Sequence, residues 1–327
     1  MILLTICSIF GIICSLFGVV IVVVSQFCTD ESVNSLLEYS KLVVDSISLP
    51  VSDHKLRSLQ YLVFAGMVSY YGFEHIDEIT SAFKNYKFLY INEPIPSFLK
   101  KQGNVSSSSF GTLNLNTVAL FHPVYDFSCR RKSAEGEIIL SSYYKMQPDE
   151  LLENMVHEVN HAVTSINNGI SFVNGDKTTR MGIYTKNHES NTRNNYILEE
   201  SFNVLQAAEI TEHILGFSNF NVCDCDIKYS LDSMRYAANK KRNGFGYEDT
   251  VGIVRPLYNN SSFGQYLKEC RITGNIQNID KMFDCKAGKN SFQTLSGICD
   301  VVSNPTLSRT MVYKKQCEGS SIVRRFC

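Results

Sequence analysis

The stretch that decides the fold is residues 147–163, which read QPDELLENMVHEVNHAV. Pro148 suits the first turn of a helix, and the acids that follow it suit the positive end of the helix dipole. Apolar residues then recur at helical spacing, namely Leu151, Leu152, Met155, Val156, Val159, Ala162 and Val163. The pattern predicts a buried helix, and residues 137–141 before it predict a short strand.

This helix contains the pentapeptide His157-Glu158-Val159-Asn160-His161. Residues four apart on a helix project from the same face one turn apart, so both imidazoles could bind a single metal ion. Glu158 is offset from both and could take a proton from a water molecule at the open coordination position. The alternative is that His157 and His161 are ordinary half-buried histidines. The helix and the strand before it favour a zinc site with Glu158 as the general base.

A third protein ligand is expected, because catalytic zinc normally takes three and leaves one position open. Residues 196–215 predict a second helix, and Glu199 and Glu200 lie in its first turn. Either carboxylate could complete the site. The alternative for Glu200 is a solvated acid that favours a helix N-terminus.

These features resemble those of the gluzincins, zinc peptidases in which a second helix supplies a glutamate after the two histidines. That helix often reads apolar, polar, Glu, small, apolar, and residues 198–202, LEESF, fit this frame. The resemblance covers residues 136–215 and implies Glu200 as the zinc ligand, with Glu199 as the alternative. It also implies an α+β, zincin-like catalytic domain with a small mixed sheet, an active-site helix and a second helix that carries the third ligand.

The chain departs from the best-known gluzincin pattern at one position. In that pattern an Asp four residues after the ligand glutamate supports a histidine through its second ring nitrogen. Val204 stands at this position, and the nearest polar residue is Asn203, which would share a helix face with Glu199. The departure leaves two questions open: whether Glu199 or Glu200 binds zinc, and which residue supports the histidines through their second ring nitrogen.

A hairpin is expected over residues 170–184, because Asn174-Gly175 lies between apolar stretches. Arg180, Tyr184 and His188 are candidates for stabilising a developing oxyanion, with ordinary surface residues as the favoured interpretation of each. Tyr247, just before the helix expected at residues 250–258, is a further candidate. We therefore name Tyr247 and His188 beside Glu158 as candidate catalytic residues.

The N-terminal segment Met1 to Cys28 is almost wholly apolar, and the first charged residue is Asp30. Its length would let a helix cross a hydrocarbon core of about 30 Å. A cleaved signal peptide would require basic residues at its start, but the first basic residue of the chain is Lys41. The pattern predicts an uncleaved transmembrane signal anchor, a single-pass membrane protein and a catalytic domain outside the cytoplasm.

The chain has 11 cysteines, and five of them lie close to the C-terminus: Cys270, Cys285, Cys299, Cys317 and Cys327. They suggest a region linked by disulfides if the compartment is oxidising.

The net charge of −1 gives no electrostatic sign of nucleic-acid binding. With 44% hydrophobic and 19% charged residues, the chain has the composition of a globular protein.

Four regions follow from the sequence: a membrane anchor at 1–28, a mainly helical region at 30–110, a zincin-like metallopeptidase domain at 111–262 and a cysteine-bearing region at 263–327. The predicted function is a membrane-anchored peptidase with one zinc ion, acting on peptide or protein substrates. One alternative is a non-catalytic, membrane-tethered binding protein with a peptidase-like fold. Another is a metal hydrolase acting on a non-peptide amide.

Overall fold

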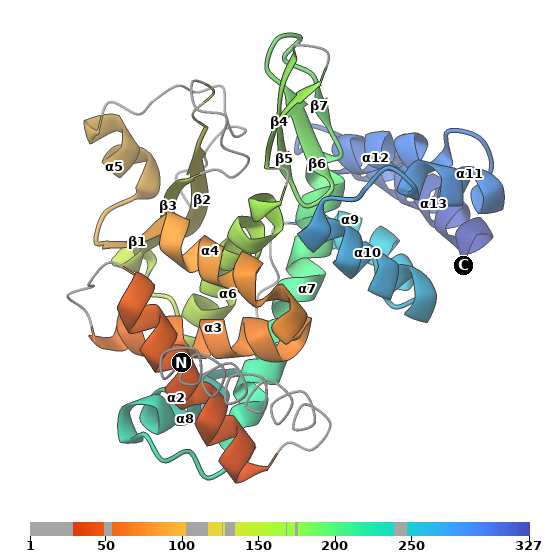
Figure 1. Cartoon of the computed structure of the whole chain (residues 1–327). Coiled ribbons are helices and arrows are strands. Elements are labelled where there is room, and N and C mark those ends of the chain that lie inside the picture. Colours follow the sequence, from red (N-terminus) through yellow and green to blue (C-terminus); the bar gives the residue numbers. More distant parts are fainter. Residues whose placement is uncertain are drawn as a thin grey trace, which may run out of the picture.

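The computed structural model (Figure 1) describes residues 29–48, 54–102, 117–125, 127, 135–167, 169–173, 176–238 and 247–327. These ranges form a mostly helical chain with two small sheets. The helices outside the site are α2 (Asp30–Ile47), α3 (His54–Tyr71), α4 (Ile76–Asn85), α5 (Ile95–Lys101), α8 (Cys225–Ala238), α9 (Glu248–Tyr258), α10 (Ser261–Thr273), α11 (Ile279–Ala287), α12 (Ser291–Val302) and α13 (Arg309–Phe326). Short 3-10 turns lie at Phe73–His75, Ser142–Tyr144 and Phe217–Asn219.

The first sheet is mixed and has the order β1 (Tyr86–Ile91), β3 (Glu135–Ser141), β2 (Ala119–Val124). β1 runs parallel to the central β3, and β2 runs antiparallel to it. Successive side chains of β3 face opposite sides. Ile138 and Leu140 join the main hydrophobic cluster, whereas Ile139 packs with Ile95 and Leu99 of α5. Both faces are covered, which explains why the strand expected at 137–141 is a continuous apolar run.

The helix expected from residue 147 is α6 (Pro148–Ile166), with 19 residues. Gln147 caps it, and the Glu150 side chain accepts a hydrogen bond of 3.0 Å from the Gln147 backbone N–H. α6 contacts the first sheet and also α4, α7, α8 and α10. Because neighbours surround it, polar residues of the helix are buried together with the apolar ones.

The second sheet is antiparallel, in the order β4 (Ile170–Val173), β5 (Asp176–Met181), β6 (Tyr184–Asn187), β7 (Arg193–Asn194). β4 and β5 confirm the expected hairpin. β5 turns into β6 through Gly182, whose φ of +56° lies in the left-handed region that favours glycine. The sheet stands beside the start of α7 (Tyr196–Gly216) (Figure 1).

α7 has 21 residues and is shared by the two large hydrophobic clusters. Leu198 and Phe202 in its first half pack with the C-terminal helices, whereas Ile210 and Ile214 pack with the N-terminal helices and α6. The first turn is held from outside, because the Ile197 backbone N–H donates to the Asp300 carboxylate of α12. The position of α7 is therefore set from both sides.

The structure corrects the expected membrane anchor. Among the described residues, no helix combines the length and the apolar character needed to cross a bilayer. α2 has 18 residues but carries Asp30, Glu31, Glu38, Lys41 and Asp45. The segment Met1 to Cys28, on which the expectation rested, lies outside the described residues. The fold is thus a mostly helical α+β arrangement, and its described helices do not support the expected transmembrane helix or the single-pass membrane localisation.

Disulfides are also absent from the C-terminal region. Cys270, Cys285, Cys299, Cys317 and Cys327 are all free thiols, with Cys270 and Cys299 buried. The region is held together instead by apolar packing, including stacked rings of Phe283 and Phe326 whose centroids are 4.2 Å apart. The suggestion of a disulfide-linked C-terminus was therefore wrong.

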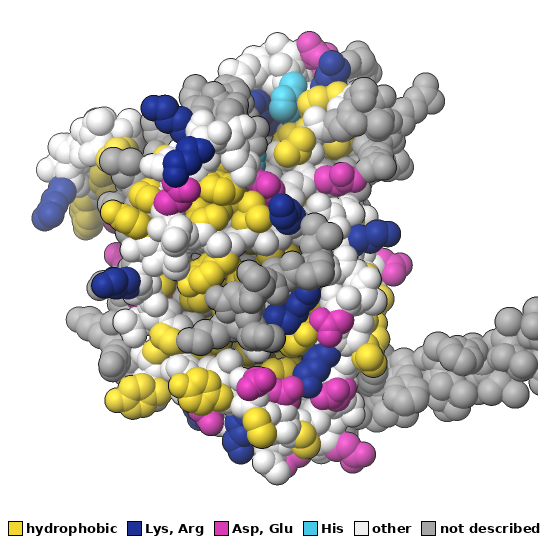
Figure 2. Space-filling view, turned by 90° about the vertical axis from the view of Figure 1, so that its left-hand side faces the viewer, with side chains coloured by type: hydrophobic (Ala, Val, Ile, Leu, Met, Phe, Trp, Pro, Cys, Tyr) yellow, Lys and Arg dark blue, Asp and Glu magenta, His cyan; other side chains and the backbone are white. Residues whose placement is uncertain are grey.

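Figure 2 shows one face of the molecule in space-filling form. Basic and acidic side chains are interspersed on it around apolar ones. Large exposed apolar side chains of the first sheet and the turn after it are Tyr90, Val124 and Tyr143. Such scattered apolar residues are normal for a protein surface and call for no partner.

Candidate metal centre

The two histidines of α6 point their Nε2 atoms at one place. His157 and His161 lie one turn apart, and their Nε2 atoms are separated by 3.2 Å. Both side chains are buried. His157, Glu158 and His161 each offer a ligand atom, and these atoms all lie within 4.8 Å of one another. The helix thus brings together two imidazoles and a carboxylate that could bind a metal ion.

α7 adds Glu200 to this group. Its Oε2 atom lies 3.3 Å from Nε2 of His157 and 3.4 Å from Nε2 of His161. The three atoms therefore form a nearly equilateral triangle. Ligands that bind zinc tetrahedrally at 2.0–2.1 Å are separated from one another by about 3.3 Å. The residues present fit one face of such a tetrahedron, with Glu200 as the third ligand.

Glu199, the alternative ligand, is used elsewhere. Its carboxylate is fully buried and accepts hydrogen bonds of 3.1 and 3.2 Å from Nε of Arg271 on α10. It also accepts a 2.8 Å bond from the Ile183 backbone N–H. A guanidinium and a backbone amide therefore compensate the charge of Glu199, and neither imidazole is needed for this.

Glu158 is buried beside the triangle. Burial raises the pKa of its carboxyl, and the neighbouring charge of Glu200 acts in the same direction, whereas His157 and His161 oppose the rise. The backbone N–H of Phe121 on β2 donates to the carboxylate. A carboxyl group in these surroundings suits a residue that exchanges a proton during a reaction.

The candidate ligands influence one another strongly. Burial alone would raise the pKa of Glu200, but His161 and His157 outweigh it, so the pKa lies well below its usual range. Burial alone would lower the pKa of His157, yet the hydrogen bond to Glu200 and the charge of Glu158 raise it. These opposite shifts favour an ionised Glu200 facing positive charge.

Tyr247 lies close to this centre, and the structure adds Tyr196. The two hydroxyls hydrogen-bond to each other. The charge of Glu200 is the largest cause of the raised pKa of each, ahead of burial, and Glu158 contributes to both. Tyr196 lies one turn before Glu200 on the same face of α7, a spacing visible in the sequence once Glu200 is taken as the ligand.

A buried polar network behind the histidines joins α6 to α7. Nδ2 of Asn203 donates to the His157 carbonyl at 2.9 Å, and Oδ1 of Asn203 accepts from Asn160 at 2.6 Å and from Nη2 of Arg271 at 2.8 Å. The Tyr71 hydroxyl donates to Oδ1 of Asn160 at 2.5 Å. Asn203 therefore fixes the backbone of the histidine helix rather than an imidazole nitrogen.

This network does not replace the Asp that the best-known pattern has at the position of Val204. Nδ1 of His161 is buried and has no hydrogen-bond partner among the described residues. Its ring is positioned instead by packing, with the Phe121 ring centroid 5.9 Å away. Asn160 and Arg271 were missed by the sequence reasoning. Asn160 gave a signal, because it is an uncharged polar residue within a helix that the sequence predicts to be buried.

The remaining candidates lie outside the centre. Arg180 is buried and donates to the carbonyls of Asn167 and Arg271, and burial lowers its pKa to about 10. Tyr184 packs in the main cluster. His188 lies 3.0 Å from the Thr179 hydroxyl, and burial followed by the charge of Lys186 lowers its pKa. The group of possible ligands found among the described residues does not include His188.

Comparison with known proteins gives no relative from which a role could be transferred. No family model, curated protein or solved structure matches the chain. The chemistry must therefore be argued from His157, Glu158, His161 and Glu200 themselves.

Proposed function

We propose that the protein is a zinc-dependent hydrolase that cleaves peptide bonds, with one zinc ion held by His157, His161 and Glu200. The observation that carries the proposal is the triangle of two Nε2 atoms and one Oε2 atom with edges of 3.2, 3.3 and 3.4 Å. Two imidazole nitrogens and a carboxylate oxygen that converge at this spacing suit the binding of one cation. The N and O ligand set is one that zinc takes in hydrolases.

When bound, zinc would supply Lewis acidity, which makes a water molecule easier to deprotonate and polarises a carbonyl group. The Glu158 carboxylate accepts the proton of the attacking water and later gives it to the departing amine. The hydroxyls of Tyr196 and Tyr247 are suited to donate hydrogen bonds to the negative charge that develops on the carbonyl oxygen. The choice of a peptide bond rests on the resemblance to gluzincins.

The deciding experiment replaces Glu158 by Gln, which keeps the shape of the side chain and removes the base. Zinc content of the purified full chain, measured by metal analysis, should remain close to one ion per chain. Hydrolysis of a mixed peptide library, followed by mass spectrometry, should fall by about 10²- to 10⁴-fold. Glu212→Gln, an exposed acid of α7, is the matched control and should leave both quantities unchanged.

Full hydrolysis by the Glu158→Gln variant would refute the assignment of the base. A wild-type chain that binds no zinc and stays folded in a chelator would refute the proposal as a whole and would favour a non-catalytic binding protein. Zinc binding together with cleavage of non-peptide amides only would keep the metal site and overturn the substrate class.

A further inference from the structure

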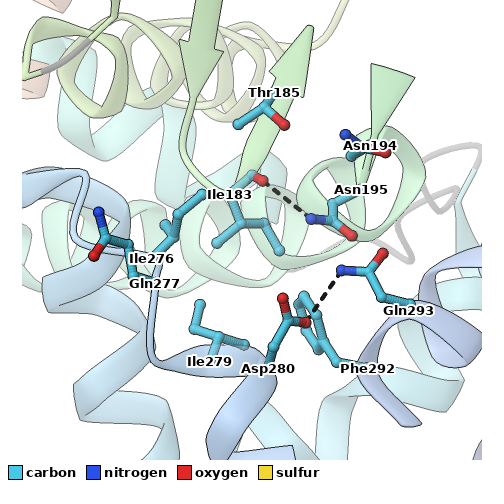
Figure 3. A pocket seen from close by; sticks show the side chains of 10 residues that line it. All are labelled: Ile183, Thr185, Asn194, Asn195, Ile276, Gln277, Ile279, Asp280, Phe292 and Gln293. Atoms are coloured by element: carbon cyan, nitrogen blue, oxygen red, sulfur yellow. Dashed lines mark hydrogen bonds between the residues drawn. The ribbon is translucent and has the colours of Figure 1, made fainter. Parts of the chain in front are cut away.

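A second site lies at the start of α7, on the side of the second sheet. A pocket of about 410 Å³ opens there between the sheet, α11 and α12 (Figure 3). Its apolar lining consists of Ile183, Ile276, Ile279 and Phe292, and its remaining lining residues are amides, one hydroxyl and one acid. No Lys, Arg or His is among the residues that line it. The pocket therefore combines aliphatic walls with polar groups of neutral or negative charge.

Asn195 points an unpaired acceptor into this pocket. It precedes the first residue of α7 with a φ of +61°, and its side chain is only 8% exposed. Nδ2 donates to the Ile183 carbonyl at 3.4 Å, which fixes the amide orientation because a carbonyl can only accept. Oδ1 has no hydrogen-bond partner among the described residues. A buried carbonyl oxygen of this kind is stabilised by a ligand that donates a hydrogen.

Asp280 and Gln293 add acceptors on the opposite side. Nε2 of Gln293 donates to Oδ1 of Asp280 at 3.1 Å. Figure 3 shows the Gln293 amide and the Asn195 amide reaching toward one another across the pocket. With its nitrogen engaged, Gln293 presents its carbonyl oxygen, and Asp280 keeps a second carboxylate oxygen. The polar groups on both sides thus offer acceptor oxygens, and the only charged side chain of the lining, Asp280, is negative.

We propose that this pocket binds a primary ammonium group on an aliphatic stem, such as a lysine side chain or a free alkylamine. An ammonium group has three donors and no acceptor, which matches the oxygens of Asn195, Gln293 and Asp280. The methylene groups of the stem pack against Ile276 and Ile279. The inference does not depend on zinc or on hydrolysis.

Other polar ligands fit less well. An anion would face the Asp280 carboxylate with no cation in the lining. A guanidinium is recognised best by a carboxylate that offers both oxygens in parallel, and Gln293 already engages one oxygen of Asp280. An ammonium group is compact, and each of its three N–H groups needs only one acceptor oxygen, so Asn195, Gln293 and Asp280 can each supply one.

The test is a binding titration of the full chain by calorimetry, with N-acetyl-lysine methylamide, its norleucine analogue and n-butylamine as probes. The lysine probe should saturate the site, and the norleucine probe, which has the same stem without the charge, should bind at least about tenfold more weakly. Asp280→Asn should weaken the lysine probe about tenfold. Asn195→Gly, which tolerates the positive φ and removes the acceptor, should weaken it further when combined with Asp280→Asn.

Asp226→Asn is the matched control, because Asp226 is an exposed acid in the first turn of α8 outside the pocket. Equal binding of lysine and norleucine probes, or lysine binding that neither pocket variant changes, would overturn the proposal. Circular dichroism of each variant excludes misfolding as the cause of weaker binding. Butylamine binding as tight as that of the lysine probe would identify free amines as the source, and much tighter lysine binding would identify a polypeptide.

Discussion

Glu199 and Glu200 are neighbours in the chain, both are buried, and they face different surroundings across α7. On one side Glu199 meets Arg271 and the Ile183 backbone N–H. On the other side Glu200 meets the Nε2 atoms of two imidazoles. A carboxylate taken out of water requires a compensating cation or hydrogen bonds. Glu199 is paired with the permanently charged guanidinium of Arg271, whereas Glu200 lies beside two imidazoles, which can be neutral, protonated or bound to a metal ion.

The difference teaches that these two acids are not interchangeable. The guanidinium of Arg271 is always charged and cannot be exchanged. The groups around Glu200 can accept an ion from solution, and their protonation changes with their neighbours. The side of α7 with Glu199 therefore contributes to structure, and the side with Glu200 is the one suited to chemistry.

The largest effect is expected when the cation of Glu199 is removed. Arg271→Leu leaves a buried carboxylate unpaired, which should lower the free energy of unfolding by about 3–5 kcal/mol in urea denaturation followed by circular dichroism. The double variant Glu199→Leu with Arg271→Leu removes both charges and should recover most of the loss. Arg255→Leu, an exposed position on α9, is the control. A loss below about 1 kcal/mol for Arg271→Leu would mean that the pair does not matter to the fold.

Replacing Glu200 tests the opposite side. Glu200→Gln removes the proposed third ligand, so zinc affinity in competition with a chelator should fall by more than the roughly 10- to 100-fold typical of residues that only support a ligand. The free energy of unfolding without zinc should change much less than in Arg271→Leu, because His157 and His161 can become neutral by losing a proton when Glu200 is removed. Glu212→Gln again serves as the control. Unchanged zinc affinity would remove Glu200 from the ligand set.

Gly182 offers a way to disturb Glu199 by shape alone. A Cβ at this position would lie 2.1 Å from Oε1 of Glu199, and the φ of +56° adds backbone strain. Gly182→Ala should therefore lower the free energy of unfolding by about 2 kcal/mol. Gly216→Ala, where a Cβ meets nothing within 4 Å, should be neutral or slightly stabilising. Equal stabilities of the two variants would contradict the tight packing around Glu199.

The smallest effect is expected at the tyrosine pair near Glu200. Tyr247→Phe removes one hydroxyl and leaves Tyr196 as a donor, so kcat/KM for a cleaved peptide should fall about tenfold, with zinc content unchanged. Tyr229→Phe, on an exposed side chain of α8, should have no effect. A Tyr247→Phe enzyme as active as the wild type would exclude this hydroxyl from catalysis.

The sequence was sufficient for local features. Helical spacing placed α6, the Asn-Gly pair between apolar stretches placed the hairpin, and the pentapeptide set His157 and His161 on one face. Each of these depends on contacts between residues close in the chain. The expected membrane segment also rested on a local pattern, and the described helices do not support it.

The choice between Glu199 and Glu200 could not be made locally. It depends on the rotation of α7 about its axis, and that rotation is tied to Arg271, which is 72 residues away from Glu199 in the chain. The same holds for Asn203, whose role follows from its contacts with Asn160 and Arg271. The spacing of residues along the chain does not tell whether Arg271 will pair with Glu199 or with Glu200.

The sharing of α7 between two hydrophobic clusters has a consequence for shortened chains. A fragment that stops after α8 would still contain the pentapeptide and Glu200 in its sequence. It would lack Arg271 and the apolar surface against which Leu198 and Phe202 pack. The helix that bears Glu200 would then be free to turn or fray at its beginning, so the proposed ion binding would require the complete chain and not only the segment that contains His157, His161 and Glu200.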